Sequence, residues 1–86
     1  MAIYSTDFAK VFSKLLGDHN ISSYQVSQFS GVDEAYLSRL KSGERKNPSP
    51  ETVVKISLAL CHLCDNVILS DIEELFNSTG RSLFSH

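Results

Sequence analysis

The chain of 86 residues is 42% hydrophobic and has a net charge of −2, which predicts one small globular domain and gives little general attraction for nucleic acids. It contains no apolar run of roughly 18 residues and no basic region followed by an apolar one at its start, so we expect neither a membrane span nor a secretory signal. Two cysteines are too few for a disulfide scaffold, and these features together favour a cytoplasmic protein.

Apolar residues near the N-terminus recur with helical spacing and predict a first helix at about residues 6–16. They occupy positions i, i+3, i+4, i+7 and i+8 of one amphipathic stripe: Phe8, Val11, Phe12, Leu15 and Leu16. Ser5 or Thr6 can cap the start of this helix. Gly17 is expected to take the left-handed conformation that closes it.

A second helix is predicted after Ser22, which forms the S-x-x-Q pattern of a capping box with Gln25. Ile21 and Val26 flank this cap at the spacing of a hydrophobic staple, which fixes the angle at which the chain enters the helix. Val26 and Phe29 are then expected to point toward the core.

A single glycine, Gly31, separates this helix from a third one predicted at about residues 33–41. We expect Gly31 to adopt a positive φ and Asp33 to cap the new helix, with Leu37 and Leu40 buried. Two short capped helices around one glycine are typical of a helix-turn-helix, which places its second helix in the major groove of DNA.

Residues 43–50, GERKNPSP, form a turn-rich loop that leads to a fourth helix. Ser49 is expected to cap this helix, and Pro50 suits its first position because the missing N–H has no helical partner there. Its inner stripe is predicted to comprise Val53, Ile56, Leu60 and Leu63.

A fifth helix is predicted from Ser70, which forms an S-x-x-E capping box with Glu73. No strand alternation or internal repeat is visible, so the sequence predicts an all-α fold of five helices. We expect residues 1–86 to form a single domain, with a core at about 6–64 and a C-terminal helix and tail at 65–86.

Charge is distributed unevenly along the chain. Residues 39–46 contain four basic residues against Glu44, a net of +3, whereas residues 65–86 contain four acidic residues against Arg81, a net of −3. A solvated surface explains either run. The asymmetry nevertheless favours a basic face beside the helix-turn-helix and an acidic end away from DNA.

The segment 61–64, Cys-His-Leu-Cys, invites a metal or redox interpretation. Zinc needs four ligands, and His19 and His86 are the histidines that remain outside the segment. A CxxC redox motif belongs near a βαβ pattern, whereas this one ends a helix of an all-α chain. We therefore expect buried or half-buried thiols, no metal and no cofactor, with a metal site shared across a dimer as the alternative. The histidines have no Ser, Cys or acidic partner at a meaningful spacing, so no enzyme activity is predicted.

A longer pattern joins these elements across their loops. It has a small residue four positions before the turn glycine, Gly-Val and a cap at the turn, a glycine after the third helix, and an Asn-Pro-Ser loop before another helix. The matching positions are Ser27, Gly31 to Asp33, Leu37 to Leu40, Gly43, Asn47 to Ser49 and Val53 to Leu60. With the first helix, this pattern covers about 60 residues and resembles the Cro/repressor-type helix-turn-helix family, also called lambda-repressor-like or XRE-type.

The resemblance implies a lambda-repressor-like DNA-binding domain and a sequence-specific transcriptional regulator that reads the major groove with helix 33–41. Ser23 stands where the family often has Gln, and Ser27 where it often has Ala. We expect the Ser27 hydroxyl to bond to a carbonyl one turn back. Glu34 either accepts a hydrogen bond from a cytosine amine or weakens binding.

The expected DNA contacts fall into two groups. The base-reading candidates are Asp33, Glu34, Ala35, Ser38 and Arg39. The phosphate-contacting candidates are Ser23, Tyr24, Gln25, Tyr36, Lys41, Arg45, Lys46 and Asn47. A bidentate contact to guanine suits Arg39, and a salt bridge with Glu34 or a neighbour is the alternative. Tyr36 can contact the DNA backbone or be half-buried packing.

The expected partners are double-stranded DNA and a second copy of the chain, because one short recognition helix gives weak specificity. Homodimers of this kind bind half-sites about 34 Å apart. Apolar residues near the C-terminus can form the two-fold interface or complete the core of one monomer: Ile68, Leu69, Leu83 and Phe84. No membrane contact and no small-molecule site is expected. The alternative function is a protein-interaction module that keeps this fold without binding DNA.

Overall fold

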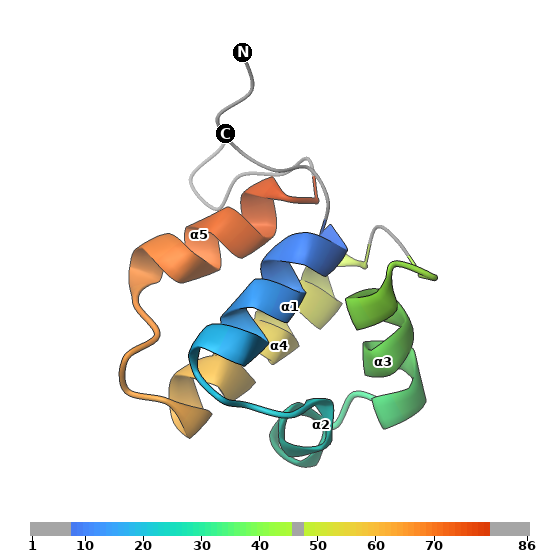
Figure 1. The fold of residues 1–86 in the computed structure, drawn as a ribbon, viewed down its shortest axis with the longest axis horizontal. Helices are drawn as coiled ribbons and strands as arrows, with labels where there is room; N and C mark the ends of the chain where they lie inside the picture. The colour runs from blue at the N-terminus through green and yellow to red at the C-terminus, as the bar shows by residue number, and fades with distance from the viewer. Residues whose placement is uncertain (1–7, 46–47, 80–86) are drawn as a thin grey trace.

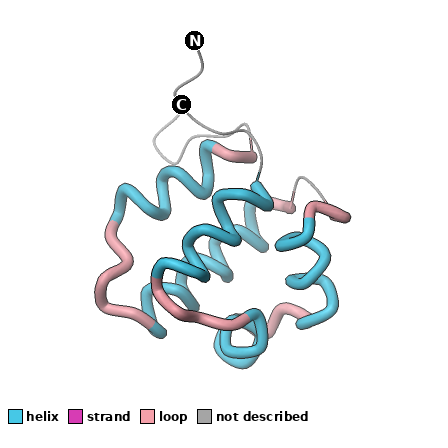
Figure 2. Tube along the Cα trace, in the orientation of Figure 1, coloured by secondary structure: helices cyan, strands magenta, loops and turns pink. Residues whose placement is uncertain are grey.

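The computed structural model describes residues 8–45 and 48–79, and within them the chain forms five α-helices and no strand (Figures 1 and 2). The helices are α1 (Phe8–Asp18), α2 (Ser23–Ser30), α3 (Glu34–Ser42), α4 (Pro50–Leu63) and α5 (Leu69–Asn77). The all-α prediction is therefore confirmed. The predicted caps Ser5 and Thr6 lie outside the described residues.

The helices surround one hydrophobic core. Figure 1 shows α1 in front of α4, with α5 on one side of this pair, α3 on the other side and α2 beneath. Packing joins α1 to α3 and α5, and joins α4 to α2 and α5. All five helices contribute fully buried side chains: Phe12, Leu16, Val26, Leu37, Leu40, Val53, Ile56, Leu60 and Leu75. The helix-turn-helix pair α2–α3 thus rests on a support built from the other three helices.

The local capping patterns fix where α2, α3 and α4 begin. Ser22 Oγ accepts the Gln25 N–H at 3.1 Å, and Gln25 Oε1 accepts the Ser22 N–H at 2.9 Å, which completes the predicted capping box. Asp33 Oδ2 accepts the Tyr36 N–H at 3.2 Å. Ser49 caps α4, with Pro50 in its first turn. Each cap supplies an acceptor to a backbone N–H that has no helical partner.

The end of α1 differs from the prediction. The helix passes through Gly17 to Asp18, and Asn20, with φ of 55°, takes the left-handed conformation expected of Gly17. The Ile21 N–H donates to Leu16 O at 2.8 Å and the Asn20 N–H to Gly17 O at 3.3 Å, which is a Schellman motif. This motif brings two buried residues, Leu16 and Ile21, to the same helix end, so burial of Ile21 places the stop beyond the glycine.

The start of α5 and two inward-facing predictions also need correction. The helix begins at Leu69, and Asp71, not Glu73, reaches back to its start, accepting the Ile68 N–H at 3.1 Å. Phe29 is 56% exposed instead of buried, and its ring lies against His62 with centroids 4.3 Å apart. Helix α2 packs on α4 and contributes Val26 as its buried residue, whereas Phe29 contacts His62 of α4 at the surface.

Candidate nucleic-acid interface

The turn between α2 and α3 is held by side-chain hydrogen bonds as well as by its glycine. Gly31 has φ of 76°, and its N–H donates to Ser27 O. Ser30 Oγ accepts the Val32 N–H at 3.1 Å. Ser27 Oγ donates to Val32 O at 2.7 Å, so it spans the turn and does not bond one turn back as predicted. These contacts fix the direction in which α3 leaves the turn.

The predicted base-reading residues share the solvent side of α3. All of them are exposed: Asp33, Glu34, Ala35, Ser38 and Arg39. Leu37 and Leu40 are fully buried on the opposite side. A residue advances about 100° around a helix, so burial of these leucines turns the intervening positions outward. The Asp33 carboxylate is engaged as the cap of α3. The exposed side chains that follow it are therefore better placed to contact a ligand.

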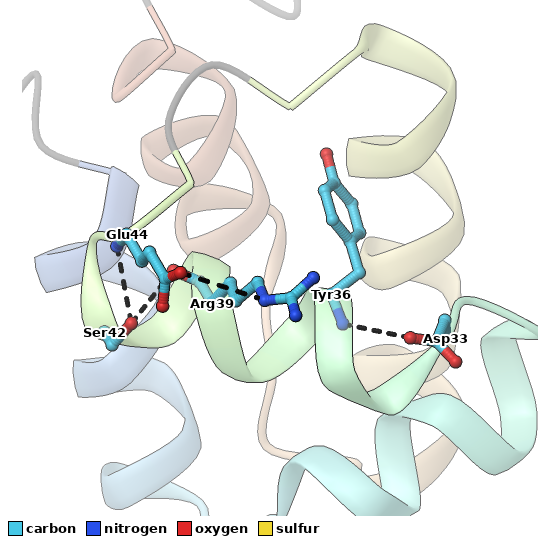
Figure 3. Close-up of polar contacts among 5 residues, drawn as sticks. All are labelled: Asp33, Tyr36, Arg39, Ser42 and Glu44. Atoms are coloured by element: carbon cyan, nitrogen blue, oxygen red, sulfur yellow. Dashed lines mark hydrogen bonds and ion pairs between the residues drawn. The ribbon is translucent and has the colours of Figure 1, made fainter.

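Arg39 pairs with an acid that helical spacing does not reveal. Its Nε lies 3.9 Å from Glu44 Oε2, and the two side chains are 50% and 71% exposed. The alternative predicted for Arg39, a surface salt bridge, therefore forms with Glu44 and not with Glu34. In Figure 3 the terminal nitrogens of the Arg39 guanidinium point away from Glu44. The edge of the guanidinium that suits a bidentate contact thus faces away from the carboxylate.

The C-terminal end of α3 is closed by a small network (Figure 3). Ser42 Oγ donates to Arg39 O at 3.1 Å and accepts the Glu44 N–H at 3.3 Å. The Arg45 N–H donates to the same Arg39 carbonyl at 3.0 Å. Gly43 makes this close turn with φ of 87°. The network sets the position of Glu44 and Arg45 relative to the exposed face of α3.

The end of α3 is also tied to α1. Ser13 Oγ on α1 donates to the Lys41 carbonyl at 3.0 Å. A Cβ at Gly43 would lie 3.6 Å from the Ala9 Cβ, an ordinary packing distance. Because α1 contributes to the core, these contacts hold α3 against the body of the domain.

Tyr36 shows the packing role that the sequence offered as one of two alternatives, and its contact with the DNA backbone stays a prediction. It is half-buried and packs against the core. The Arg45 guanidinium carbon lies 5.9 Å from the centroid of its ring, within the range of a cation–π contact. Tyr36 therefore provides packing and also holds a cation beside α3.

The remaining phosphate candidates that the structure describes lie at the start of α2, near the end of α3 and in the turn after it. Ser23 is half-buried, whereas Tyr24, Gln25, Lys41 and Arg45 are exposed. The side-chain oxygen of Gln25 is engaged in the capping box, so its amino group is the part left to donate. Lys46 and Asn47 lie outside the described residues. Gln28 is also exposed on α2, although no sequence pattern pointed to it as a phosphate contact.

The Cys-His-Leu-Cys segment differs from its prediction in two respects. Cys61 is exposed and Cys64 is half-buried, so the expectation of covered thiols was wrong for Cys61. Cys64 Sγ lies 3.4 Å from His19 Nδ1, and His19 Nε2 lies 3.8 Å from Asp71 Oδ2. His19 thus has both a thiol and an acidic partner, contrary to the prediction, because the fold joins residues 45 positions apart.

Two general properties of the described residues bear on ligand type. Among residues 8–45 and 48–79, no group of three His, Cys, Asp or Glu side chains is arranged to hold a metal ion. In the same part of the chain, none of the helices has the length and apolar character needed to cross a membrane.

Comparison with known protein families identifies the helix-turn-helix segment. The sequence model of a family described as helix-turn-helix matches residues 13–60, which is more than half of the chain. The matched segment begins within α1 and ends within α4, so it includes the whole α2–α3 pair. No curated protein and no solved structure shows a significant match.

Proposed function

We propose that the chain is a sequence-specific transcriptional regulator whose α3 reads base edges in the major groove. The premise is that the chain belongs to the Cro/repressor-type (lambda-repressor-like) helix-turn-helix family. This family consists of DNA-binding regulators of transcription. One observation carries the finer proposal: the base-reading candidates lie exposed on a helix whose opposite face is locked into the core by Leu37 and Leu40. Such a helix can enter a groove without rearrangement of the domain.

Each candidate residue receives a role from its chemistry. Arg39 suits guanine, because its guanidinium can donate two parallel hydrogen bonds to O6 and N7. Ala35 can contact a thymine methyl group, Ser38 can bond to a base edge, and Glu34 can accept from the cytosine amine. Asp33 stands at the start of this face and acts mainly as the helix cap.

Phosphate contacts would fix the domain on the duplex. The basic candidates are Lys41, Arg45 and Lys46, joined by the polar residues Ser23, Tyr24, Gln25, Tyr36 and Asn47. Contacts at the start of α2 would also use the N–H groups of a helix N-terminus, which favour anions. We further propose that two copies bind together, so that two recognition helices reach half-sites about 34 Å apart.

A second function is favoured by specific charges. Glu34 is exposed at the start of α3, Glu44 lies beside Arg39, and the whole chain has a net charge of −2. These acids would repel phosphate, and they suit a protein-interaction module that keeps the fold without binding DNA. The two functions differ in their response to salt.

The first experiment is binding to random duplex DNA at several salt concentrations, measured by fluorescence anisotropy. With about six phosphate contacts, the affinity should fall roughly a thousandfold between about 50 and 200 mM salt, because binding releases counterions. An absence of measurable affinity even at the lowest salt would reject DNA binding and favour the interaction module. Sequences selected from a random pool would then supply the preferred site.

The second experiment tests the role of Arg39. Arg39→Ala should cost about 1–3 kcal/mol on the selected site and relax the preference at one base position. Lys55→Ala is a matched control, because Lys55 is also 50% exposed and is also ion-paired, with Glu51 on α4. Equal losses on selected and random DNA would show that Arg39 contacts phosphate instead of a base.

A further inference from the structure

Three helix ends meet at a cluster of reactive side chains distant in sequence from the recognition helix. His19 follows the end of α1, Cys64 caps the end of α4, and Asp71 lies in the first turn of α5 (Figure 1). The His19 ring stands between the other two: Nδ1 is 3.4 Å from Cys64 Sγ, and Nε2 is 3.8 Å from Asp71 Oδ2. The His19 and Asp71 side chains are 14% and 27% exposed, so the cluster is largely covered but open to small molecules.

We propose that Cys64 is a reactive thiol that hydrogen peroxide oxidises, with His19 as its proton acceptor and Cys61 as the thiol that completes a disulfide. The thiolate is the nucleophilic form of cysteine, and a neighbouring imidazole can form it by taking the thiol proton. Here Nδ1 is the nitrogen in reach of the sulfur. The other nitrogen faces a carboxylate, which stabilises the imidazolium that results.

Asp71 is held in place for this role by the backbone. Its Oδ2 also accepts the Ile68 N–H at 3.1 Å, the contact that begins α5. The carboxylate therefore keeps its orientation whether or not His19 is charged. The arrangement of nucleophile, base and orienting acid is the one that activates nucleophiles in general.

The proposed oxidation takes place in two steps. The Cys64 thiolate attacks one peroxide oxygen, the O–O bond breaks, and the departing hydroxide takes the proton from the imidazolium to give water. The sulfur is oxidised by two electrons to a sulfenic acid, and the peroxide is reduced. The Cys61 sulfur then attacks the Cys64 sulfur, and the sulfenic hydroxyl leaves as water together with the Cys61 thiol proton.

The spacing of the two cysteines suits the second step. Three residues along a helix separate their Cα atoms by about 5 Å, which is within the range of disulfides. Cys64 is the C-cap of α4, and its N–H still donates to Leu60 O, so its Cα keeps the spacing of the last helical turn. Cys61 is exposed and free to turn toward Cys64. Closing the bond would draw Cys64 away from His19.

The test compares the two cysteines within one folded chain. Each thiol is alkylated by iodoacetamide near neutral pH, and mass spectrometry follows the two sites separately. If exposure governed the rates, Cys61 would react faster, because Cys64 is the more covered of the two. The proposal predicts the reverse order, with Cys64 faster by roughly tenfold. Faster alkylation of Cys61 in the wild-type chain would overturn it.

Variants separate the roles of the partners. His19→Gln should slow Cys64 to the rate of Cys61 or below, whereas His62→Gln should change nothing, since the His62 ring packs against Phe29 instead. Asp71→Asn removes the charge but keeps an oxygen for the Ile68 N–H, and it should slow Cys64 partially. An unchanged Cys64 rate in a His19→Gln chain that retains its helical circular dichroism would reject the role of His19.

Treatment with hydrogen peroxide tests the products. The wild-type chain should lose two hydrogens as the disulfide forms. Cys61→Ser should stop at a sulfenic acid, which dimedone traps on Cys64. Cys64→Ser should be unreactive at the same peroxide dose. Oxidation of Cys61 in the Cys64→Ser chain at the wild-type rate would contradict the proposal.

Discussion

At the scale of single residues, Arg39 has a partner, Glu44, that would compete with the proposed DNA contact. An ion pair as exposed as Arg39–Glu44 contributes at most about 1 kcal/mol to stability, so a guanine or a phosphate can displace it. The carboxylate nevertheless adds a negative charge next to the proposed interface. Whether Glu44 weakens binding through this charge or helps by orienting the guanidinium can be decided by substitution.

We expect Glu44→Gln to raise the affinity for random duplex DNA a few-fold, which corresponds to about 0.2–1 kcal/mol for an exposed charge pair. The free energy of unfolding should stay within about 0.5 kcal/mol of the wild type, since the side chain is on the surface. Anisotropy titrations and urea denaturation measure the two effects. Glu51→Gln is the control, because Glu51 is 80% exposed and pairs with Lys55 on α4. A lower affinity in Glu44→Gln would show that the carboxylate positions Arg39 for DNA.

At the scale of elements, the α2–α3 turn depends on one glycine for its backbone conformation and not for space. Gly31 has φ of +76°, and a Cβ added there would meet no atom within 4 Å. Gly17 also has open space around its position, but it lies inside α1. Alanine substitutions at the two glycines therefore separate the free-energy cost of a left-handed backbone from the effect of adding a side chain.

Gly31→Ala should lower the free energy of unfolding by about 1–2 kcal/mol, because a left-handed conformation strains residues that carry a Cβ. Gly31→Asn should cost less, since asparagine tolerates this conformation. Gly17→Ala should raise stability by about 0.5–1 kcal/mol, because alanine favours the helix interior. Urea denaturation of the three variants gives the comparison. Equal effects of alanine at both positions would contradict the assigned role of Gly31.

The elements that sequence could predict are those defined by near neighbours. The caps at Ser22, Asp33 and Ser49 act over three residues, so their patterns are readable before any fold is known. The end of α1 was misplaced because Asn20, not the nearby glycine, lets Ile21 reach the core. Burial in the tertiary structure decided that stop, and it overrode the local preference of glycine for helix ends.

The candidate sites were likewise predictable from sequence only where near neighbours define them. The exposed face of α3 followed from the spacing of its buried leucines, and the exposure of its candidate residues agrees with that prediction. Glu44 lies beyond the end of the helix, so helical spacing does not place it beside Arg39. Cys64 and His19 are 45 positions apart and meet only because α1 and α4 pack in one core.

At the scale of the whole molecule, size favours binding by two copies. The described part of the molecule measures 35 × 28 × 23 Å, so its longest dimension is close to the roughly 34 Å of one turn of DNA. One copy would therefore cover about one half-site, and a second copy alongside it would bring another α3 to the next turn. The nine residues of α3 could contact few base pairs, so the proposed second copy would double the number of base pairs that are read.

Two exposed apolar areas could join the copies. Ile68 and Leu69 at the start of α5 are 59% and 62% exposed, and Val54 and Leu58 on α4 are 44% and 66% exposed. Leu83 and Phe84, which were predicted to extend the first area, lie outside the described residues. We propose the start of α5 as the interface, because Ile68 and Leu69 belong to the apolar residues that the sequence offers for it, and the α4 area is the alternative.

Leu69→Lys should weaken association and lower the affinity for DNA with two half-sites, while leaving the affinity for one half-site almost unchanged. The reason is that a buried lysine at the interface loses its hydration, whereas in the monomer it replaces an exposed leucine and leaves the core intact. Sedimentation analysis measures the association, and titration of single and paired half-sites measures the binding. Leu58→Lys is the matched control, with similar exposure on α4. If Leu58→Lys separates the copies and Leu69→Lys does not, the two-fold interface lies on α4, and the proposed place of α5 in it is wrong.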